Sequence, residues 1–456
     1  MAKLTDFLQS NLEKIILVLM AIFMFLAPFS VSRIYQTLLP APTSVLVTFL
    51  SGFGLLFLIV YFKYVSKQSS LLNPLDKEQR AFVLALYIPG LIAILAGAYN
   101  LTVVLSSEYV EYFTASLPTR VINMLLFLIL FVCFLKFISL LSNQTLESIA
   151  KAYVYGIFVI ILFGIWQFLH FLIGYPMFTL DTRSFVHSVN SDVLFNFRLT
   201  SLTDEPSYLV PFLIDGLLIA FFFFKSKLRY FIQFFLPGMF VLIFSFAVSG
   251  YANLAMVIAF IVLILITARM PNKKKVFIYS CYGLIPLIII GLFNTGLVMQ
   301  FLSPILGRVE TIFDIQHHSR LYMLVMPFFW LFDYSIINSI FGFGPGGYEF
   351  LNLTKFLHHR GSVAVTSNNV FIDILFEHGI FGFIVFTTMF VTIGVKLFLK
   401  RNENNYYLYA IILWFHLAVT SLYRSDFASP RFWAVIIIMF IIMELAKRRS
   451  VKTSIK

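Results

Sequence analysis

Long apolar runs, separated by short polar breaks, follow one another along almost the whole chain. A helix of about 20 apolar residues crosses the roughly 30 Å hydrocarbon core of a bilayer. A β-barrel is excluded, because its strands would alternate apolar and polar positions. We therefore predict an all-α, polytopic membrane protein with about twelve transmembrane helices. The predicted spans are 14–32, 44–62, 81–100, 121–142, 150–172, 207–224, 230–248, 251–268, 276–297, 379–398, 406–422 and 430–446.

The composition agrees with this pattern. Hydrophobic residues make up 60% of the 456 residues and charged residues only 12%, whereas soluble domains are about half apolar and about a quarter charged. The first run is too long for a signal-peptide core and no A-x-A site follows it, so we expect a retained helix. Cys133 and Cys281 both lie in apolar runs, which favours neither a disulfide nor a thiolate metal site.

Positive charges are divided unevenly between alternate connections. An even number of spans places both termini on one side, and the connections on that side hold 23 of the 33 Lys and Arg residues. By the positive-inside rule this side is cytoplasmic, so the net charge of +12 reflects topology and phospholipid contact, not nucleic-acid binding. Nine of the ten outer cations are arginine. Their planar guanidinium groups suit phosphate or carboxylate, either in a site or among lipid headgroups.

Two outer connections, 173–206 and 298–378, are long, and every other connection is short. Long ordered loops are where function usually concentrates. No internal repeat of the kind that builds secondary transporters is visible. We therefore predict one membrane domain, 1–456, whose two large extracytoplasmic loops carry short surface helices.

The first large loop ends in "FNFRLTSLTDEPS". Asp204 is expected to cap the next helix, with Glu205 and Pro206 in its first turn, where proline and an anion are both favourable. Capping does not explain Arg198, which stands beside an apolar cluster at the membrane edge. Arg198 is therefore a candidate anion-binding group, and Glu205 is either a helix-terminus residue or a general base.

The second large loop contains "HHSRLYMLVMPFFWLF". Apolar residues recur at helical spacing from 321 to 332, which predicts a helix lying on the membrane surface that Arg320 begins. His317 and His318 are adjacent and do not share a helix face, so a metal site is not favoured. They are either phosphate contacts when protonated or solvated loop residues.

The glycine-rich stretch "FGFGPGGYEF" follows in the same loop. Such a sequence cannot continue a helix, and it lets the backbone approach a ligand closely. A nucleotide-binding loop is excluded, since no Lys-Ser/Thr pair follows it.

The stretch "TSNNVFIDILFEHGIFG" then enters an apolar helix with many polar groups. Thr366 or Ser367 is expected to cap the helix. Asn369, Asp373 and Glu377 follow at intervals of four and share one face, and "GIFG" thins the helix for close packing. A carboxylate facing hydrocarbon costs several kcal/mol. This face therefore either pairs with loop arginines at the interface or lines a cavity open to the outside.

Together these motifs resemble the signature region of the O-antigen polymerase and ligase superfamily. The resemblance covers about 190–385 and the twelve-span layout. Ligases of this family usually have histidine where this chain has Asn368, and asparagine cannot exchange a proton as imidazole does near neutral pH. The resemblance therefore favours a polymerase.

The resemblance implies an O-antigen polymerase: a glycosyltransferase that joins undecaprenyl-diphosphate-linked oligosaccharide repeat units into O-antigen-type polysaccharide, in lipopolysaccharide biosynthesis. It would be a multi-pass protein of the bacterial inner membrane with both termini cytoplasmic and its active site facing the periplasm. No metal or other cofactor is implied. A chain-length regulator and a flippase are the expected protein partners.

Arg198 and Arg320 are expected to bind the diphosphates, while Glu205, or alternatively Asp373 or Glu377, activates the acceptor hydroxyl. Two other functions stay open: a ligase that transfers glycan to lipid A core, and a flippase or transporter. A transporter should carry charges inside its spans, where Asp215 is the main candidate. Further substrate contacts are expected from Arg308, His317, His318, Gly344, Gly346, Asn368 and Asn369.

Overall fold

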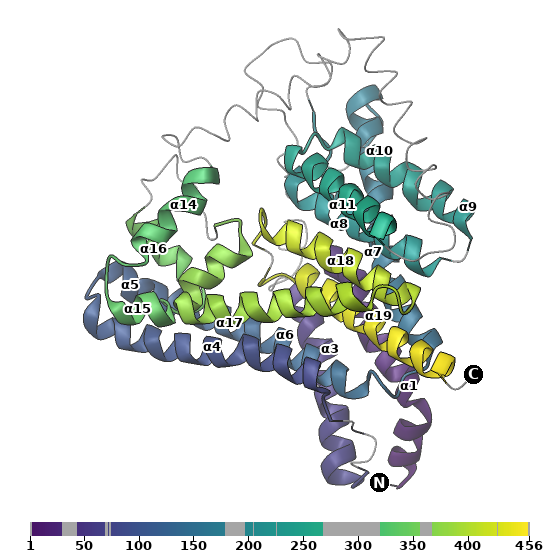
Figure 1. Ribbon diagram of the computed structural model, residues 1–456, viewed down its shortest axis with the longest axis horizontal. Helices are drawn as coiled ribbons and strands as arrows, with labels where there is room; N and C mark the ends of the chain where they lie inside the picture. The colour runs from purple at the N-terminus through teal and green to yellow at the C-terminus, as the bar shows by residue number, and fades with distance from the viewer. Residues whose placement is uncertain are drawn as a thin grey trace.

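The computed structural model describes residues 2–29, 43–68, 72, 74–177, 197–203, 205–224, 226–267, 320–355, 367–425 and 427–454. This part of the chain is helical (Figure 1), as predicted. Nine helical segments within it are long and apolar enough to cross a membrane. The total of twelve spans stays a prediction, because the expected span 276–297 lies outside the described ranges.

The longer helices overlap the predicted apolar runs, but those that begin at Ala2 and Val370 start well before the predicted positions 14 and 379. Short helices lie in the second large loop and in two of the shorter connections. The longer helices are α1 (Ala2–Leu26), α3 (Thr43–Val60), α4 (Lys77–Val103), α6 (Leu117–Phe137), α7 (Asn143–Ile173), α8 (Pro206–Phe223), α10 (Leu236–Phe244), α11 (Val248–Thr267), α17 (Val370–Lys400), α18 (Asn405–Ser421) and α19 (Pro430–Ser454). The shorter ones are α5 (Ser107–Glu111), α9 (Lys227–Tyr230), α14 (Arg320–Trp330), α15 (Ile336–Phe341) and α16 (Tyr348–Thr354).

Helix α19 forms the centre of the bundle. Every residue from 431 to 443 is buried, and the helix packs against α18, α7 and α6. Trp433 stacks on Phe127 of α6, with ring centres 5.7 Å apart. A helix that is apolar on all sides is expected in such a position, since it has no face to present to water.

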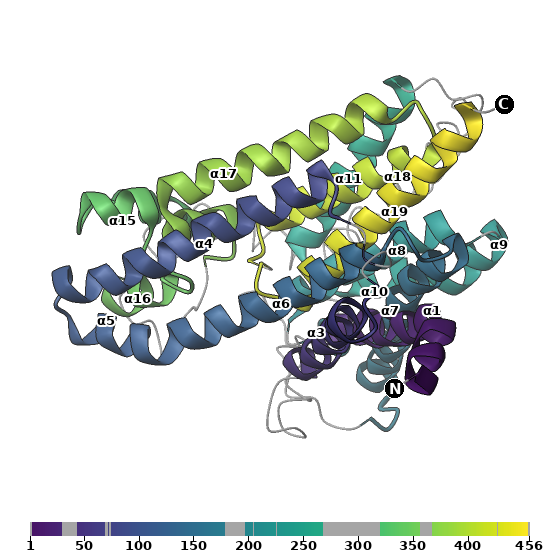
Figure 2. The same cartoon turned by 90° about the horizontal axis from the view of Figure 1, so that it is seen from below.

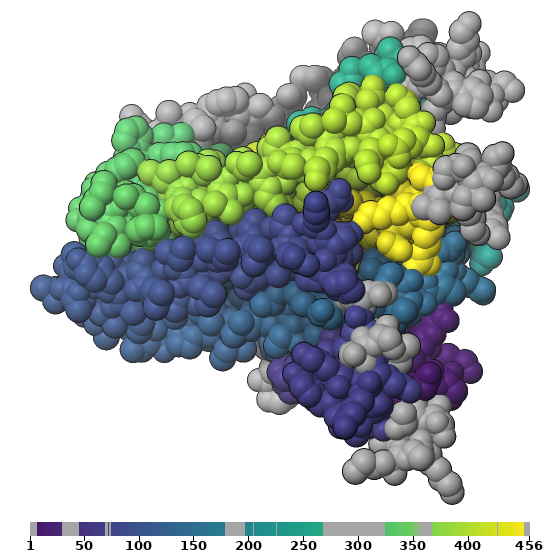
Figure 3. All heavy atoms as spheres, turned by 60° about the horizontal axis from the view of Figure 1, so that its bottom comes forward, coloured from purple at the N-terminus to yellow at the C-terminus, as the bar shows by residue number. Residues whose placement is uncertain are grey.

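Helix α17 lies along α4 in both ribbon views (Figures 1 and 2). The short helices α14, α15 and α16 gather with α5 at one end of this pair. Residues of α5, α14, α16 and α17 contribute to a second, aromatic-rich hydrophobic cluster there. In the space-filling view, α4 and α17 make one continuous surface with these short helices at its end (Figure 3).

Polar contacts join connections that the sequence analysis places on the same, inner side. Asp76 caps α4 by accepting a hydrogen bond from the backbone N–H of Gln79 at 2.7 Å, and it also pairs with Lys447 of α19. Burial alone would raise the pKa of Asp76, but these two partners outweigh it and hold the pKa below its usual value. Other inner contacts are Glu78–Lys396, Ser142–Glu13, Gln68–Gln9, Asn404–Ser450 and Arg448–Asn143.

This pairing agrees with the predicted alternation of connections between two sides. Which of the two sides faces the cytoplasm stays a prediction. The predicted outer connections also meet one another, and the candidate site lies where they do.

Candidate functional site

The polar start of α17 is fixed by a side-chain cap. Asn369 Oδ1 accepts hydrogen bonds from the backbone N–H groups of the second and third helical residues, at 2.9 and 3.1 Å. Asn368 has a φ of 59°, in the left-handed region, so the helix cannot begin earlier. The expectation that Thr366 or Ser367 caps α17 is therefore wrong. Ser367 is a turn residue, and its Oγ donates to the carbonyl of Asn369 at 2.9 Å.

One turn further along, the carboxylate of Asp373 is buried and held from both sides. Its Oδ1 accepts from the backbone N–H of Ser367 at 2.8 Å. Its Oδ2 accepts from the hydroxyl of Ser425. Ser425 belongs to the segment between α18 and α19, described over 422–425 and 427–429 and called the connector below.

Helix α17 is interrupted at Gly379, where φ is 67° and ψ is −175°. The expectation of a continuous helix that is merely thinned at "GIFG" is therefore wrong. The break frees carbonyl groups that would otherwise bond within the helix. The carbonyl of Phe376 accepts from the N–H of Phe343 at 3.0 Å, and that of Glu377 accepts from the N–H of Gly344 at 3.1 Å.

The glycine-rich loop and the break in α17 fit together backbone against backbone. A Cβ on Gly342 would lie 2.6 Å from the backbone N of Gly379, and a Cβ on Gly379 would lie 2.5 Å from the backbone N of Gly342. Both glycines also have positive φ, 87° and 67°. Close backbone approach was expected of this loop, but Gly342 and Gly344 approach α17 itself.

Two tyrosines from the α5–α6 region hold the other side of the glycine-rich loop. The hydroxyl of Tyr109 donates to the carbonyl of Phe343 at 3.0 Å. The hydroxyl of Tyr112 donates to the carbonyl of Pro345 at 2.9 Å. Both tyrosines are buried, so the loop is clamped between them and α17.

Arg120 stands beside Gly346 at the edge of this assembly. A Cβ on Gly346 would lie 2.7 Å from Arg120 Cγ, so a side chain at 346 would displace the arginine. Arg120 attracts the carboxylates of Glu377 and Asp373 electrostatically. His378 is buried, with its Nε2 3.8 Å from Glu377 Oε2. A guanidinium group and two carboxylates therefore lie within electrostatic range of one another, along the part of α17 that precedes its break.

The first large loop returns to the bundle at Arg198, which is buried. Its Nε donates to the carbonyl of Ser245, just after α10, at 3.4 Å. The next residues are held by Gln167 of α7, whose Oε1 accepts from the N–H groups of Thr200 and Ser201 at 2.9 and 2.8 Å. Arg198 is thus fixed by its own contact with Ser245 and by the contacts that Gln167 makes with the residues just after it.

Helix α8 begins at Pro206, and its N-cap residue is Glu205. The expectation that Asp204 caps this helix with Glu205 inside the first turn is therefore wrong, because Glu205 has extended backbone angles and proline takes the first helical position. The Glu205 carboxylate accepts a hydrogen bond from Ser207 Oγ at 3.2 Å.

The connector links the start of α8 with the start of α17. The guanidinium carbon of Arg424 lies 3.2 Å from the ring centre of Tyr208, in the first turn of α8. The carbonyl of Leu422 accepts from Asn369 Nδ2 at 2.9 Å. Through the connector, segments from both large loops belong to one polar assembly.

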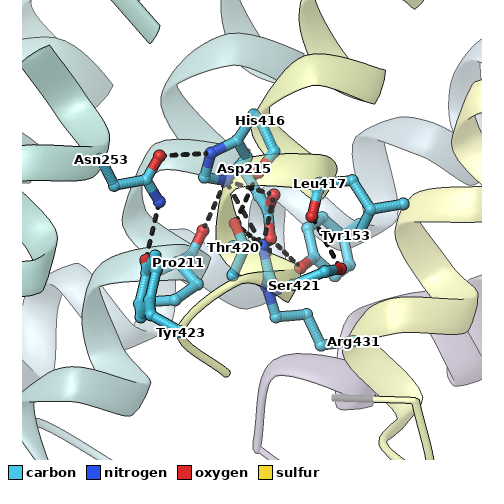
Figure 4. Close-up of polar contacts among 10 residues, drawn as sticks. All are labelled: Tyr153, Pro211, Asp215, Asn253, His416, Leu417, Thr420, Ser421, Tyr423 and Arg431. Carbon is cyan, nitrogen blue, oxygen red and sulfur yellow. Dashed lines mark hydrogen bonds and ion pairs between the residues drawn. The ribbon is translucent and has the colours of Figure 1, made fainter. Parts of the chain in front are cut away.

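Behind the connector, a polar network is buried among four helices (Figure 4). Asp215 of α8 accepts from Arg431 Nε at 2.7 Å and Nη2 at 3.1 Å, and from the hydroxyl of Tyr153 at 3.0 Å. The Nε2 of His416 lies 3.0 Å from Asp215 Oδ1. All four side chains are almost completely inaccessible to solvent.

The network continues from His416 toward the connector. His416 Nδ1 lies 3.2 Å from Asn253 Oδ1, and Asn253 Nδ2 donates to the hydroxyl of Tyr423 at 2.7 Å. Tyr423 is the second residue of the connector, so a chain of polar contacts runs from Asp215 to the connector (Figure 4).

The expected site residues have different outcomes. Asn369 and Asp373 lie at the start of α17, while Glu377 lies near the break in α17 and contacts the glycine-rich loop at Gly344 and Gly346.

Arg198 is held against Ser245 after α10, and Glu205 is the N-cap residue of α8, in whose first turn Tyr208 contacts Arg424 of the connector. Arg320 begins α14 as predicted, but its side chain lies outside what the structure describes. Arg308, His317 and His318 lie outside the described ranges altogether.

Sequence reasoning missed Arg120 and Ser425 as members of the site, and it missed the pairing of Asp215 with Arg431. Arg120, Ser425 and Arg431 are single polar residues at the edges of apolar runs and Asp215 is a single charge within one, and only the fold reveals their partners. Across the described residues, no cluster of three or more His, Cys, Asp or Glu could hold a metal ion.

No protein-family model matches this chain, and a search of curated proteins finds no match either. A functional argument for this chain therefore depends on the geometry of the site and on the motifs quoted above.

Proposed function

We propose that this chain is a membrane glycosyltransferase of the O-antigen polymerase type, which joins lipid-diphosphate-linked oligosaccharides at the outer face of the membrane. The observation that carries the proposal is that the Asp373 and Glu377 carboxylates of α17 lie within electrostatic range of the Arg120 guanidinium, which stands beside the glycine-rich loop. Carboxylates for proton transfer and guanidinium groups for a departing anion are the two components that this reaction requires.

In the proposed reaction, a sugar hydroxyl of one repeat unit attacks the anomeric carbon of the other. A glycosidic C–O bond forms, and the bond from that carbon to the lipid diphosphate breaks. The hydroxyl proton passes to a carboxylate, and the diphosphate leaves with the bonding electrons. Fixed guanidinium groups stabilise the charge that develops on the leaving group. Arg198, Arg320 and Arg120 are the proposed diphosphate contacts.

Among the three carboxylates, the geometry favours Glu377 as the group that accepts the hydroxyl proton. Both oxygens of Asp373 are engaged, by Ser367 and by Ser425. Glu205 receives a hydrogen bond from Ser207, its near neighbour in the chain. Glu377 interacts with the backbone N–H of Gly346 in the glycine-rich loop and lies within electrostatic range of Arg120, where a bound acceptor would meet all three.

The test uses purified protein in nanodiscs, supplied with undecaprenyl-diphosphate-linked repeat units and no nucleotide. We expect a ladder of polymer lengths. Glu377→Gln should slow chain extension by about 10²–10⁴-fold, the range for loss of a general base, while Glu205→Gln should have little effect. The absence of any ladder with wild-type protein would defeat the function, and full activity of Glu377→Gln would defeat the assignment of the base.

The ligase alternative is distinguished by the acceptor in the same assay. If lipid A core receives glycan and repeat units are not extended, the protein is a ligase. The presence of Asn368 at the position where family ligases have histidine favours the polymerase.

One observation supports the alternative of a transporter: Asp215, His416 and Arg431 form an ionisable network inside the helix bundle. Its geometry fits a structural role better than a passage for cargo. Asp215 is already surrounded by Arg431, Tyr153 and His416, so cargo would have to displace three protein partners.

A further inference from the structure

The buried network lies next to the candidate site without belonging to it. Asp215, Arg431 and His416 are all essentially inaccessible, so no substrate can reach them without a large rearrangement. Burying an ion pair seldom adds stability, because desolvation offsets the attraction between the charges. Ionisable residues inside a membrane bundle call for another explanation.

The contacts of the network explain why these ionisable residues are buried there, because they hold the connector at both of its ends. At its far end, Arg431 is the second residue of α19 and binds Asp215 through two nitrogens. At its near end, the hydroxyl of Tyr423 accepts from Asn253, which is itself in contact with His416. Two contacts of the network, Arg431 with Asp215 and Asn253 with Tyr423, therefore set where the connector ends and where it begins.

The connector in turn supplies groups to the site. Ser425 donates to the carboxylate of Asp373, and the carbonyl of Leu422 accepts from Asn369. A shift of the connector would therefore change the hydrogen bonding of two residues at the start of α17. Arg424, between Leu422 and Ser425, would move away from the ring of Tyr208.

We propose that His416, Asn253 and Tyr423 are positioning residues, which hold the connector so that Ser425 and Arg424 complete the outer site. As a statement about catalysis this rests on the proposed function. As a statement about the connector it is independent of the reaction, and the two parts are tested separately.

The first measurement is amide hydrogen exchange of the connector in nanodiscs, with two matched tyrosine variants. Tyr423→Phe removes the hydroxyl that contacts Asn253, and Tyr153→Phe removes one that contacts Asp215 but is remote in the chain from the connector. We expect Tyr423→Phe to speed exchange in residues 422–429 by about tenfold, the effect of one lost hydrogen bond. Tyr153→Phe should leave this exchange within about twofold of wild type.

A second variant, Asn253→Leu, removes both contacts of the amide at similar volume. Since Tyr423 and Asn253 would act as a unit, the double variant should exchange no faster than Asn253→Leu alone. Wild-type exchange rates in Tyr423→Phe, or additive effects in the double variant, would overturn the positioning role.

The second measurement is the rate of chain extension at varied acceptor concentration. Tyr423→Phe should lower kcat about tenfold with KM nearly unchanged, because it misplaces groups near Asp373 without removing a substrate contact. Tyr153→Phe should keep wild-type kcat. A rise in KM at unchanged kcat would contradict positioning. If wild-type protein extends no chains at all, the proposed function fails, and the exchange result still decides the role of the network.

Discussion

Asp215 receives hydrogen bonds from Arg431 and Tyr153 and lies in contact with His416, so its environment is matched to a charge. Removing only one member of a buried ion pair leaves the other charge desolvated and uncompensated, whereas removing both can be almost neutral. The two kinds of substitution should therefore differ sharply in stability.

We expect Asp215→Leu to destabilise the protein by about 3–5 kcal/mol, because the guanidinium of Arg431 is left buried without its carboxylate. The double variant Asp215→Leu with Arg431→Met should recover most of that loss. The free energy of unfolding, measured by denaturant titration in mixed micelles, decides between these outcomes. If the double variant has the same free energy of unfolding as Asp215→Leu, the loss of stability does not come from leaving Arg431 without its carboxylate.

Residue identities alone could not have revealed this pair. Asp215 and Arg431 are 216 positions apart; Asp215 is a single charge in the middle of one apolar run, and Arg431 is a single charge at the start of another. Arg431 is one of the nine arginines that the sequence analysis counts on the outer side. Its side chain is instead directed into the bundle, where it contacts Asp215 (Figure 4).

At the scale of elements, the apolar runs were sufficient to place most helices. The span predicted at 406–422 is α18, Asn405–Ser421, and the one at 207–224 is α8, Pro206–Phe223. Helix starts were harder, because several polar residues compete for each cap. Asn368 in the left-handed region and the extended angles of Glu205 decide these two starts, and neither can be read from side-chain type.

The break in α17 leads to a prediction about Gly379. Gly379→Ala would place a methyl group against the backbone of the glycine-rich loop, at a positive φ that alanine tolerates poorly. We expect a loss of about 3 kcal/mol or more, the sum of backbone strain and overpacking.

Gly174 is the matched control for this substitution. It also has a positive φ, 70°, but a Cβ there would meet nothing within 4 Å. Gly174→Ala should therefore cost only about 1–2 kcal/mol, from strain alone. Equal losses for the two variants, by the same denaturant titration, would show that the close backbone approach at Gly379 is unimportant.

For the whole molecule, the pairing of connections into two groups leads to a prediction about sidedness. In a background with Cys133 and Cys281 replaced by serine, Glu108→Cys lies on the predicted outer side and Glu403→Cys on the predicted inner side. Both positions are exposed. A membrane-impermeant maleimide added to spheroplasts should label position 108, and should label position 403 only after permeabilisation. The reverse pattern would place the candidate site in the cytoplasm and defeat the proposed reaction.

The reciprocal contact of Gly342 and Gly379 also has an evolutionary consequence. A side chain on either glycine would occupy the space of the other glycine's main chain. Neither position can therefore acquire a side chain while the backbone of the other segment stays where it is. Among descendants of this protein, the two positions should be kept together or lost together, and a lineage that loses one should also have rebuilt the loop around the other.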